Sequence, residues 1–176
     1  DWLLVVTLND IAERKRVEDE LVRQATHDIL TGLPNRALIH SRLVSALQRS
    51  RRNDQNLALL FVDLDHFKPV NDRHGHATGD SLLARVAQRL REVVRPTDVV
   101  ARLGGDEFAL LLLGVRAQVH AETVADKVVN AVRAPFVVAE LELLIGASVG
   151  VAFGVDAAGG PSGLLARADA MLYRAK

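Results

Sequence analysis

Two apolar runs separated by only two glycines constrain the fold of this chain most strongly. The runs span Asp98–Leu103 and Asp106–Leu113, and Gly104 and Gly105 stand between them. Two residues leave no room for a crossover helix, and glycine tolerates the positive φ of a tight hairpin turn. The two runs are therefore predicted to be antiparallel neighbours, which argues against a fully parallel sheet.

The remaining elements predict how this hairpin is completed. Continuous apolar runs over Leu57–Val62 and Ile145–Phe153 are typical of buried strands. Apolar residues at helical spacing predict helices over residues 36–51, 79–94, 117–132 and 162–173. The core order is strand, helix, strand, strand, helix, strand, so the predicted class is α+β. We expect a ferredoxin-like or polymerase-palm-like (split βαβ) sheet that contains antiparallel strands, is flanked by helices and follows an N-terminal linker helix.

The first residues give a separate expectation. The apolar run Trp2–Leu8 is too short to span a bilayer and lacks the features of a signal peptide, so we interpret it as a strand. A helix over residues 10–26 follows, with a thin apolar stripe made by Ile11, Val17, Leu21 and Ala25. With fewer than three heptads, it fits a partner helix or a solvated connector equally well. Both ends of the chain look trimmed from a longer protein.

Composition limits the function classes. The 22 lysines and arginines balance the 22 aspartates and glutamates, so no basic field predicts nucleic-acid binding, and an anionic ligand must be held locally. The absence of cysteine excludes disulfides and cysteine-ligated zinc and suits a reducing compartment. A length of 176 residues fits one domain with an appendage. We expect a cytoplasmic location without direct membrane contact by this part of the protein.

Acidic residues lie at the predicted ends of two strands. Asp63 and Asp65 end the Leu57 strand, while Asp106 and Glu107 begin another. In a split βαβ sheet the two central strands are antiparallel neighbours, so these ends meet at one edge. Hard oxygen ligands there suit magnesium, which phosphoryl transfer requires. Taken singly, each feature also fits a solvated strand end or a plain turn, and it is their combination that favours a metal site.

Several motifs resemble those of the GGDEF family of diguanylate cyclases. Residues 102–108 read RLGGDEF and resemble the signature RxGGDEF. Four further stretches are similar to family motifs: DILTGLPNR at 28–36, DLDHFK at 63–68, NDRHGHATGD at 71–80 and ADAMLYRAK at 168–176. The resemblance covers residues 27–176. It implies an enzyme that condenses two GTP molecules into cyclic di-GMP and two pyrophosphates with Mg²⁺ (or Mn²⁺).

The resemblance also implies a role for individual residues in the metal site. Asp63 and Asp106 would hold the metal through their side chains, and Leu64 through its carbonyl. Glu107 would bind a second metal or assist deprotonation of the attacking 3′-hydroxyl. Asp63, Asp106 and Glu107 are thus the expected catalytic residues.

The expected substrate site follows from the same motifs. Asn71 and Asp80 would hydrogen-bond the guanine edge, and Lys68 and Lys176 would reach the triphosphate. Gly104 and Gly105 would leave room for phosphates to approach the backbone. The remaining expected substrate-binding residues are His66 and Phe67.

Regulation and assembly are implied as well. Family members bind one GTP per domain, so the resemblance predicts a homodimer. Arg95 and Asp98 resemble the RxxD inhibitory site for cyclic di-GMP, although an ordinary loop pair has the same spacing. The stretch Asp10–Lys15 resembles the DITERK join that follows PAS sensor domains. Residues 1–9 would then be the last sensor strand, 10–26 a signalling helix, and 27–176 a cyclase domain truncated at its C-terminus.

Two other functions are compatible with the same fold. A catalytically silent module could hold GTP or cyclic di-GMP and regulate an attached partner, but the intact glycines and acids at 104–107 favour an active enzyme. A different nucleotidyl cyclase would need adenine recognition, whereas Asn71 and Asp80 favour guanine.

Overall fold

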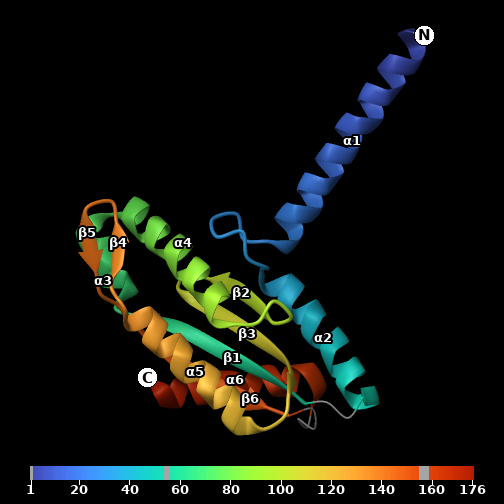
Figure 1. The fold of residues 1–176 in the computed structure, drawn as a ribbon. Helices are drawn as coiled ribbons and strands as arrows, with labels where there is room; N and C mark the ends of the chain where they lie inside the picture. Colours follow the sequence, from blue (N-terminus) through green and yellow to red (C-terminus); the bar gives the residue numbers. More distant parts are fainter. Residues whose placement is uncertain (1, 54–55, 155–158) are drawn as a thin grey trace.

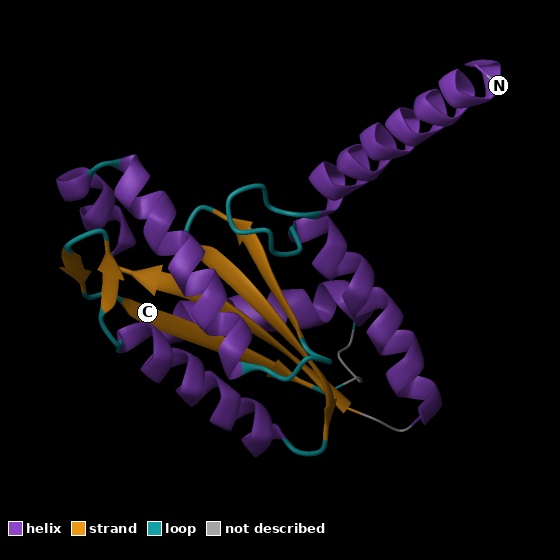
Figure 2. Ribbon diagram, turned by 45° about the horizontal axis from the view of Figure 1, so that its top comes forward, coloured by secondary structure: helices purple, strands orange, loops and turns teal. Residues whose placement is uncertain are grey.

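A four-stranded antiparallel sheet is the centre of the molecule. The computed structural model describes residues 2–53, 56–154 and 159–176, and the strand order is β2-β3-β1-β6. Every pair of neighbours is antiparallel (Figure 2). The strands are β1 (Asn56–Asp65), β2 (Val99–Gly104), β3 (Glu107–Val115) and β6 (Gly146–Phe153). This order confirms the predicted split βαβ arrangement, with β1 and β3 in the middle.

Helices cover both faces of this sheet (Figure 1). The pattern of side chains along β1 decides which helices lie where, because alternate residues point to opposite faces. Leu57 and Leu59 join a core cluster with α2 and α6, whereas Leu60 and Val62 join the larger cluster with α4 and α5. The helices are α2 (Arg36–Asn53), α3 (Phe67–His74), α4 (His76–Val93), α5 (Gln118–Arg133) and α6 (Gly160–Ala175). A separate small hairpin consists of β4 (Phe136–Val138) and β5 (Leu141–Leu143).

The N-terminal segment differs from its prediction. A single helix, α1 (Trp2–Thr26), includes the run Trp2–Leu8, so the predicted strand is wrong. A strand needs a neighbouring strand to satisfy its backbone N–H and C=O groups, whereas a helix satisfies them within its own segment. The predicted helix over residues 10–26 is confirmed, and α1 projects away from the sheet (Figure 1). Within the described part of the chain, no helix is long and apolar enough to cross a bilayer.

The glycine hairpin is confirmed, but its turn lies one residue later than predicted. Gly104 is the last residue of β2 and pairs with Glu107, so Gly105 and Asp106 form the turn. The register shifts between Arg102 and Gly104, which leaves Leu103 unpaired in a bulge. Asp106 therefore lies in the turn and not in a strand, and the alternation of side chains along β3 does not apply to it.

Candidate active site

The end of β1 and the glycine hairpin lie side by side. Asp63 of β1 pairs directly with Glu107 of β3, and the Leu64 N–H donates to the Asp106 carbonyl at 3.3 Å. Directly opposed residues on neighbouring strands point to the same face of a sheet, with Cβ atoms about 5 Å apart. Asp63 and Glu107 therefore both project toward the face covered by α2 and α6. The predicted meeting of the acidic strand ends is confirmed.

Two basic side chains neutralise this acidic edge. The Lys176 ammonium lies 2.8 Å from a carboxylate oxygen of Asp63. The hydrogen bond to Asp63 raises the pKa of Lys176; burial opposes this, and the charges of Asp63, Asp106 and Asp65 add to the increase. Arg36, the first residue of α2, lies 3.4 Å from Glu107 on an exposed surface. The acids thus lie between one cation at the end of α6 and one at the start of α2.

The oxygen donors at this edge fit magnesium better than a structural metal. Among the described residues, no group of three or more His, Cys, Asp or Glu side chains converges closely enough to hold an ion. Magnesium is commonly bound by one or two carboxylates together with water and substrate phosphates, without a complete protein cage. Asp63, the turn residue Asp106 and the backbone around Leu64 supply such a partial set.

Asp65 has a different position from Asp63. It lies two residues further along β1, where the Ser148 hydroxyl donates to its carboxylate at 2.9 Å. Ser148 is on β6 and is buried. This hydrogen bond ties the end of β1 to β6, so Asp65 has a structural partner that the sequence did not indicate.

The chain turns sharply between β1 and α3. His66 adopts a left-handed conformation with φ 66°, and no side chain caps the first turn of α3. Uncapped N–H groups and the helix dipole favour an anion at such a terminus. Phe67 is only 7% exposed and packs in the core, which leaves its backbone and not its ring for a ligand. Lys68, the next residue, is exposed.

Asn71 and Asp80 come from different helices and are brought close together. Asn71 belongs to α3, and its side chain lies against Gly79 in the first turn of α4. Asp80 is the next residue of α4 and is exposed. An amide and a carboxylate are therefore available at one junction between α3 and α4.

Gly104 and Gly105 both have positive φ, 143° and 52°. A Cβ atom added to either residue would meet nothing within 4 Å. Glycine is therefore favoured here by the backbone conformation and not by a lack of space for a side chain. The same open space leaves the turn accessible to a ligand.

Arg102 holds the hairpin turn in place, a role that the motif match did not indicate. Its Nε and Nη2 atoms donate to the Gly105 carbonyl at 3.1 and 2.8 Å, and its Nη1 lies 3.1 Å from both carboxylate oxygens of Asp28. Asp28 also accepts hydrogen bonds from the backbone and hydroxyl of Thr31 at 2.8 and 2.6 Å. The sequence gives little indication of this ion pair beyond the opposite charges, because 74 positions separate the two residues.

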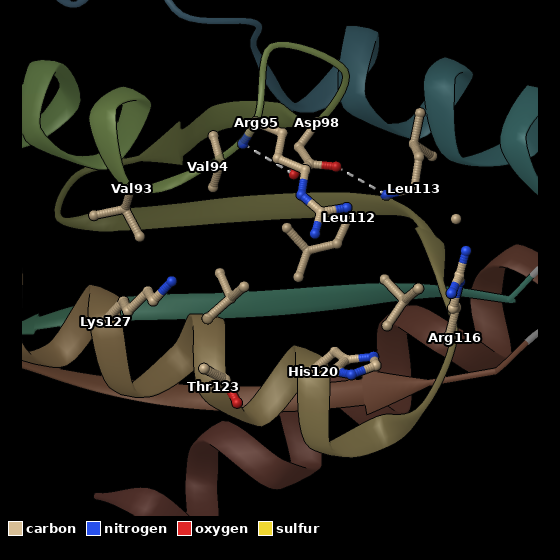
Figure 3. A pocket seen from close by; sticks show the side chains of 13 residues that line it. Val93, Val94, Arg95, Asp98, Leu112, Leu113, Arg116, His120, Thr123 and Lys127 are labelled. Atoms are coloured by element: carbon tan, nitrogen blue, oxygen red, sulfur yellow. Dashed lines mark hydrogen bonds between the residues drawn. The ribbon is translucent and has the colours of Figure 1, made fainter.

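Arg95 and Asp98 lie far from this edge. They precede β2, whereas the hairpin turn follows it, and a six-residue strand separates the two by about 20 Å. Asp98 accepts hydrogen bonds from the backbone N–H groups of Arg95 and Leu113 at 3.1 and 3.0 Å. Figure 3 shows both residues beside a cavity of about 540 Å³. Across the cavity, the same view shows three further side chains that can carry positive charge: Arg116, His120 and Lys127.

Known proteins resemble the chain over most of its length. The bifunctional diguanylate cyclase/cyclic di-GMP phosphodiesterase MucR of Pseudomonas aeruginosa is 45% identical over 161 residues, which are 92% of this chain and 23% of MucR. The diguanylate cyclase TpbB of the same organism is 42% identical over 165 residues, which are 92% of this chain and 38% of TpbB. The chain thus spans well under half the length of both relatives.

Solved structures agree with this likeness. The GGDEF domain of TpbB superimposes with a TM-score of 0.82 at 42% identity, over 85% of this chain and 88% of that one. The coiled coil and GGDEF domain of DgcB from Caulobacter crescentus, in complex with cyclic di-GMP, gives a TM-score of 0.82 at 29% identity, over 98% and 93% of the two chains. Residues 25–176 match the family profile described as "Diguanylate cyclase, GGDEF domain". The chain therefore belongs to the GGDEF family of diguanylate cyclases.

Proposed function

We propose that this domain is an active diguanylate cyclase. The 3′-hydroxyl of one GTP attacks the α-phosphorus of a second GTP, and pyrophosphate leaves. The 3′-hydroxyl of the second nucleotide then attacks the α-phosphorus of the first, a second pyrophosphate leaves, and the ring of cyclic di-GMP closes. The observation that carries the proposal is the direct pairing of Asp63 with Glu107, beside a turn that places Asp106 against Leu64. An enzyme that transfers nucleotidyl groups needs acids placed in this way around the reacting phosphate.

Asp63, Asp106 and the Leu64 carbonyl would hold Mg²⁺ or Mn²⁺. When bound, the metal offsets negative charge on phosphate oxygens. The Lys176 ammonium lies 2.8 Å from the Asp63 carboxylate. We propose that the lysine side chain leaves Asp63 and contacts the triphosphate when the substrate binds. Glu107 either completes a second metal site or accepts the 3′-hydroxyl proton.

The remaining substrate contacts are assigned in the same proposal. The exposed carboxylate of Asp80 accepts the N1–H and N2–H groups of guanine, and the Asn71 amide holds the base beside it. The uncapped first turn of α3 at Phe67, with His66 and Lys68 beside it, faces phosphate oxygens. Because the proposed substrate GTP is a cytoplasmic nucleotide, we also propose a cytoplasmic location for this domain.

Two domains must meet, because each binds one GTP and the reaction joins two. We propose a homodimer held by α1, on which Val17 and Leu21 are 55% and 61% exposed. An apolar stripe on a helix that projects from the body suits a second copy of the same helix. As a signalling helix, α1 would pass on changes in a preceding sensor domain, for which the join at Asp10–Lys15 favours a PAS domain.

We propose that the cavity beside Arg95 and Asp98 is a site of product inhibition. Cyclic di-GMP carries two phosphates, and the cavity beside Arg95 and Asp98 also has Arg116, His120 and Lys127 along its wall. Arginine can bind phosphate or the guanine edge through paired N–H groups. Asp98 shapes this site chiefly by fixing the loop, because its carboxylate accepts two backbone hydrogen bonds.

The alternative function is a silent module that binds GTP or cyclic di-GMP without turnover. Product analysis separates the two. With GTP and Mg²⁺, the purified protein should form cyclic di-GMP, detected by mass spectrometry. Glu107→Gln keeps the shape of the side chain but removes its charge, so we expect turnover to fall by about 100-fold or more with an unchanged circular dichroism spectrum.

The same assay includes the controls. Glu122→Gln, an exposed position on α5, should leave turnover unchanged. In progress curves with added cyclic di-GMP, Arg95→Ala should relieve inhibition. GTP binding without product in the wild type would establish the silent module in place of the enzyme. Full turnover by Glu107→Gln would remove Glu107 from the catalytic residues.

A further inference from the structure

Position 79 requires glycine because no room is left for a side chain, and not because of an unusual backbone conformation. It lies in the first turns of α4, is buried, and is not among the residues with positive φ. Alanine is a better helix former than glycine at such a position. A Cβ atom there, however, would overlap Oδ1 of Asn71 and would lie 2.9 Å from its Cγ and 3.3 Å from Cζ of Phe67. The place of a side chain at residue 79 is thus filled by the Asn71 amide.

Asn71 is an unusual occupant of that space. Its Oδ1 is buried and has no hydrogen-bond partner among the described residues. A buried polar atom without a partner is costly, so apolar packing alone does not account for an asparagine here. Residue 71 as a whole is only half-buried, so part of it reaches the surface, and the exposed Asp80 directly follows Gly79 in α4. The position suits a residue that is held in place for a ligand.

We propose that Gly79 is a positioning residue that sets base recognition, because its missing side chain lets α4 hold the Asn71 amide beside Asp80. This inference rests on the proposed function and deepens it. The ligand class is a purine nucleotide with a 6-oxo and a 2-amino group. Any side chain at residue 79 would displace the amide and leave Asp80 to recognise the base alone.

A double-mutant cycle tests whether Gly79 acts through Asn71. The four proteins are the wild type, Gly79→Ala, Asn71→Ala and the double variant. The probe is 3′-deoxy-GTP, which lacks the attacking hydroxyl and so reports binding without turnover, measured by calorimetry with Mg²⁺. We expect Asn71→Ala and Gly79→Ala each to weaken binding by about tenfold, and the double variant to bind no more weakly than Asn71→Ala.

Thermal unfolding provides an independent readout. Gly79→Ala should lower Tm in the wild type, because the new methyl group overlaps the amide. It should lower Tm much less, or raise it, in the Asn71→Ala background, because the overlap with the amide is gone, the contact 3.3 Å from Cζ of Phe67 remains, and alanine is the better helix former. The matched control on the same helix is Ser81→Ala, whose hydroxyl is exposed and donates only to the Ala77 carbonyl, and it should bind the probe like the wild type.

The possible results distinguish the inference from the function on which it rests. A wild type that does not bind the probe overturns the proposed function and this inference with it. Wild-type binding by Gly79→Ala, or additive losses in the cycle, overturns the inference and leaves the function standing. If Gly79→Ala fails to fold, recovery of folding in the double variant supports the inference, and failure of both variants overturns it.

Discussion

One guanidinium group links the loop that follows α1 to the glycine hairpin. Arg102 donates to the Gly105 carbonyl and binds Asp28, which follows α1 by two residues. The planar guanidinium donates to the two acceptors at once, in two fixed directions. A lysine ammonium has no such planar arrangement of donors and could not replace it. The backbone N–H of Arg102 also donates to the Pro34 carbonyl at 3.0 Å. Arg102 thus connects the loop after α1 to the turn of the glycine hairpin through both its side chain and its backbone.

The pH dependence of this connection can be predicted for Asp28→Asn. Burial raises the pKa of Asp28, but hydrogen bonds from Thr31 and Arg102 outweigh it, so the pKa lies below its usual value. A carboxyl with a depressed pKa in the folded state stabilises the protein at neutral pH, and this contribution is lost as pH falls through the folded pKa. The variant should therefore be less stable by about 1–3 kcal/mol at pH 7.

Urea unfolding at several pH values checks this expectation. The difference in unfolding free energy between wild type and variant should shrink as pH falls below about 4, the ordinary pKa of aspartate. Asp126→Asn, exposed on α5, should show no comparable difference at pH 7. A difference for Asp28→Asn that stays constant down to the acid transition would argue against a role for its charge.

The sequence alone indicated much of the candidate site, for reasons visible at particular residues. Asp63, Asp106 and Glu107 were predicted to meet because the order of strands and helices along the chain indicates a split βαβ sheet, whose two central strands are antiparallel neighbours. The hydrogen bonds of Arg102, Ser148 and Arg36 were not predictable, because they join residues far apart in the chain whose side chains meet only after packing. The roles of the paired residues Asn71 and Asp80 remain a prediction.

At the element scale, α6 lies directly on β6. A Cβ atom at Gly150 would overlap the Leu172 N and the Ala168 carbonyl and would lie 2.7 Å from the Leu172 Cα. These are backbone atoms, which cannot move without the helix. The close approach places Lys176, the residue after α6, within 2.8 Å of Asp63. Gly150 therefore controls how near the end of α6 comes to the acidic edge.

Gly150→Ala should destabilise the protein by about 1–3 kcal/mol, because overpacking displaces a whole helix. Chemical denaturation measures this loss. Gly146→Ala on the same strand is the matched control, since its Cβ would lie 3.0 Å from Oδ2 and 3.3 Å from Cβ of Asp65, which are side-chain atoms and not the backbone of a helix. Equal losses for the two variants would contradict the importance of the helix backbone at Gly150.

Elements were predicted better than their ends. The strands β1, β3 and β6 and the helices α2 and α5 had strong hydrophobic periodicity, and the structure has them close to the predicted bounds. The turn of the glycine hairpin was misplaced by one residue because the bulge at Leu103 leaves no mark in the apolar pattern. The strand predicted over Trp2–Leu8 was wrong. The β-branched residues of this run favour a strand locally, but the available hydrogen-bond partners decide between strand and helix.

At the scale of the whole molecule, α1 projects away from the sheet and the helices that cover it (Figure 1). If two copies join through this helix, turnover should rise with protein concentration. The variant with Val17→Glu and Leu21→Glu places two negative charges on the exposed apolar stripe. It should be monomeric in sedimentation velocity and should lose most turnover at micromolar concentration, yet still bind 3′-deoxy-GTP.

Arg16→Glu provides the matched control for this prediction. It changes the net charge by the same amount, but away from the apolar stripe, because at 100° per residue Arg16 lies about 100° or more around α1 from Val17 and Leu21. The control should keep the association state and turnover of the wild type. Normal turnover by a strictly monomeric double variant would disprove the assembly through α1.

Asn35 sits where the projecting helix joins the body. Its side-chain amide donates to the Ala25 carbonyl near the end of α1 at 2.9 Å, while its carbonyl oxygen accepts from the Leu38 N–H at the start of α2 at 3.0 Å. A single residue thus terminates one helix and initiates the next, which resists bending between them. If the far end of α1 moves, we therefore expect α1 and α2 to move together, as a rigid-body rotation, with little change in the angle between them.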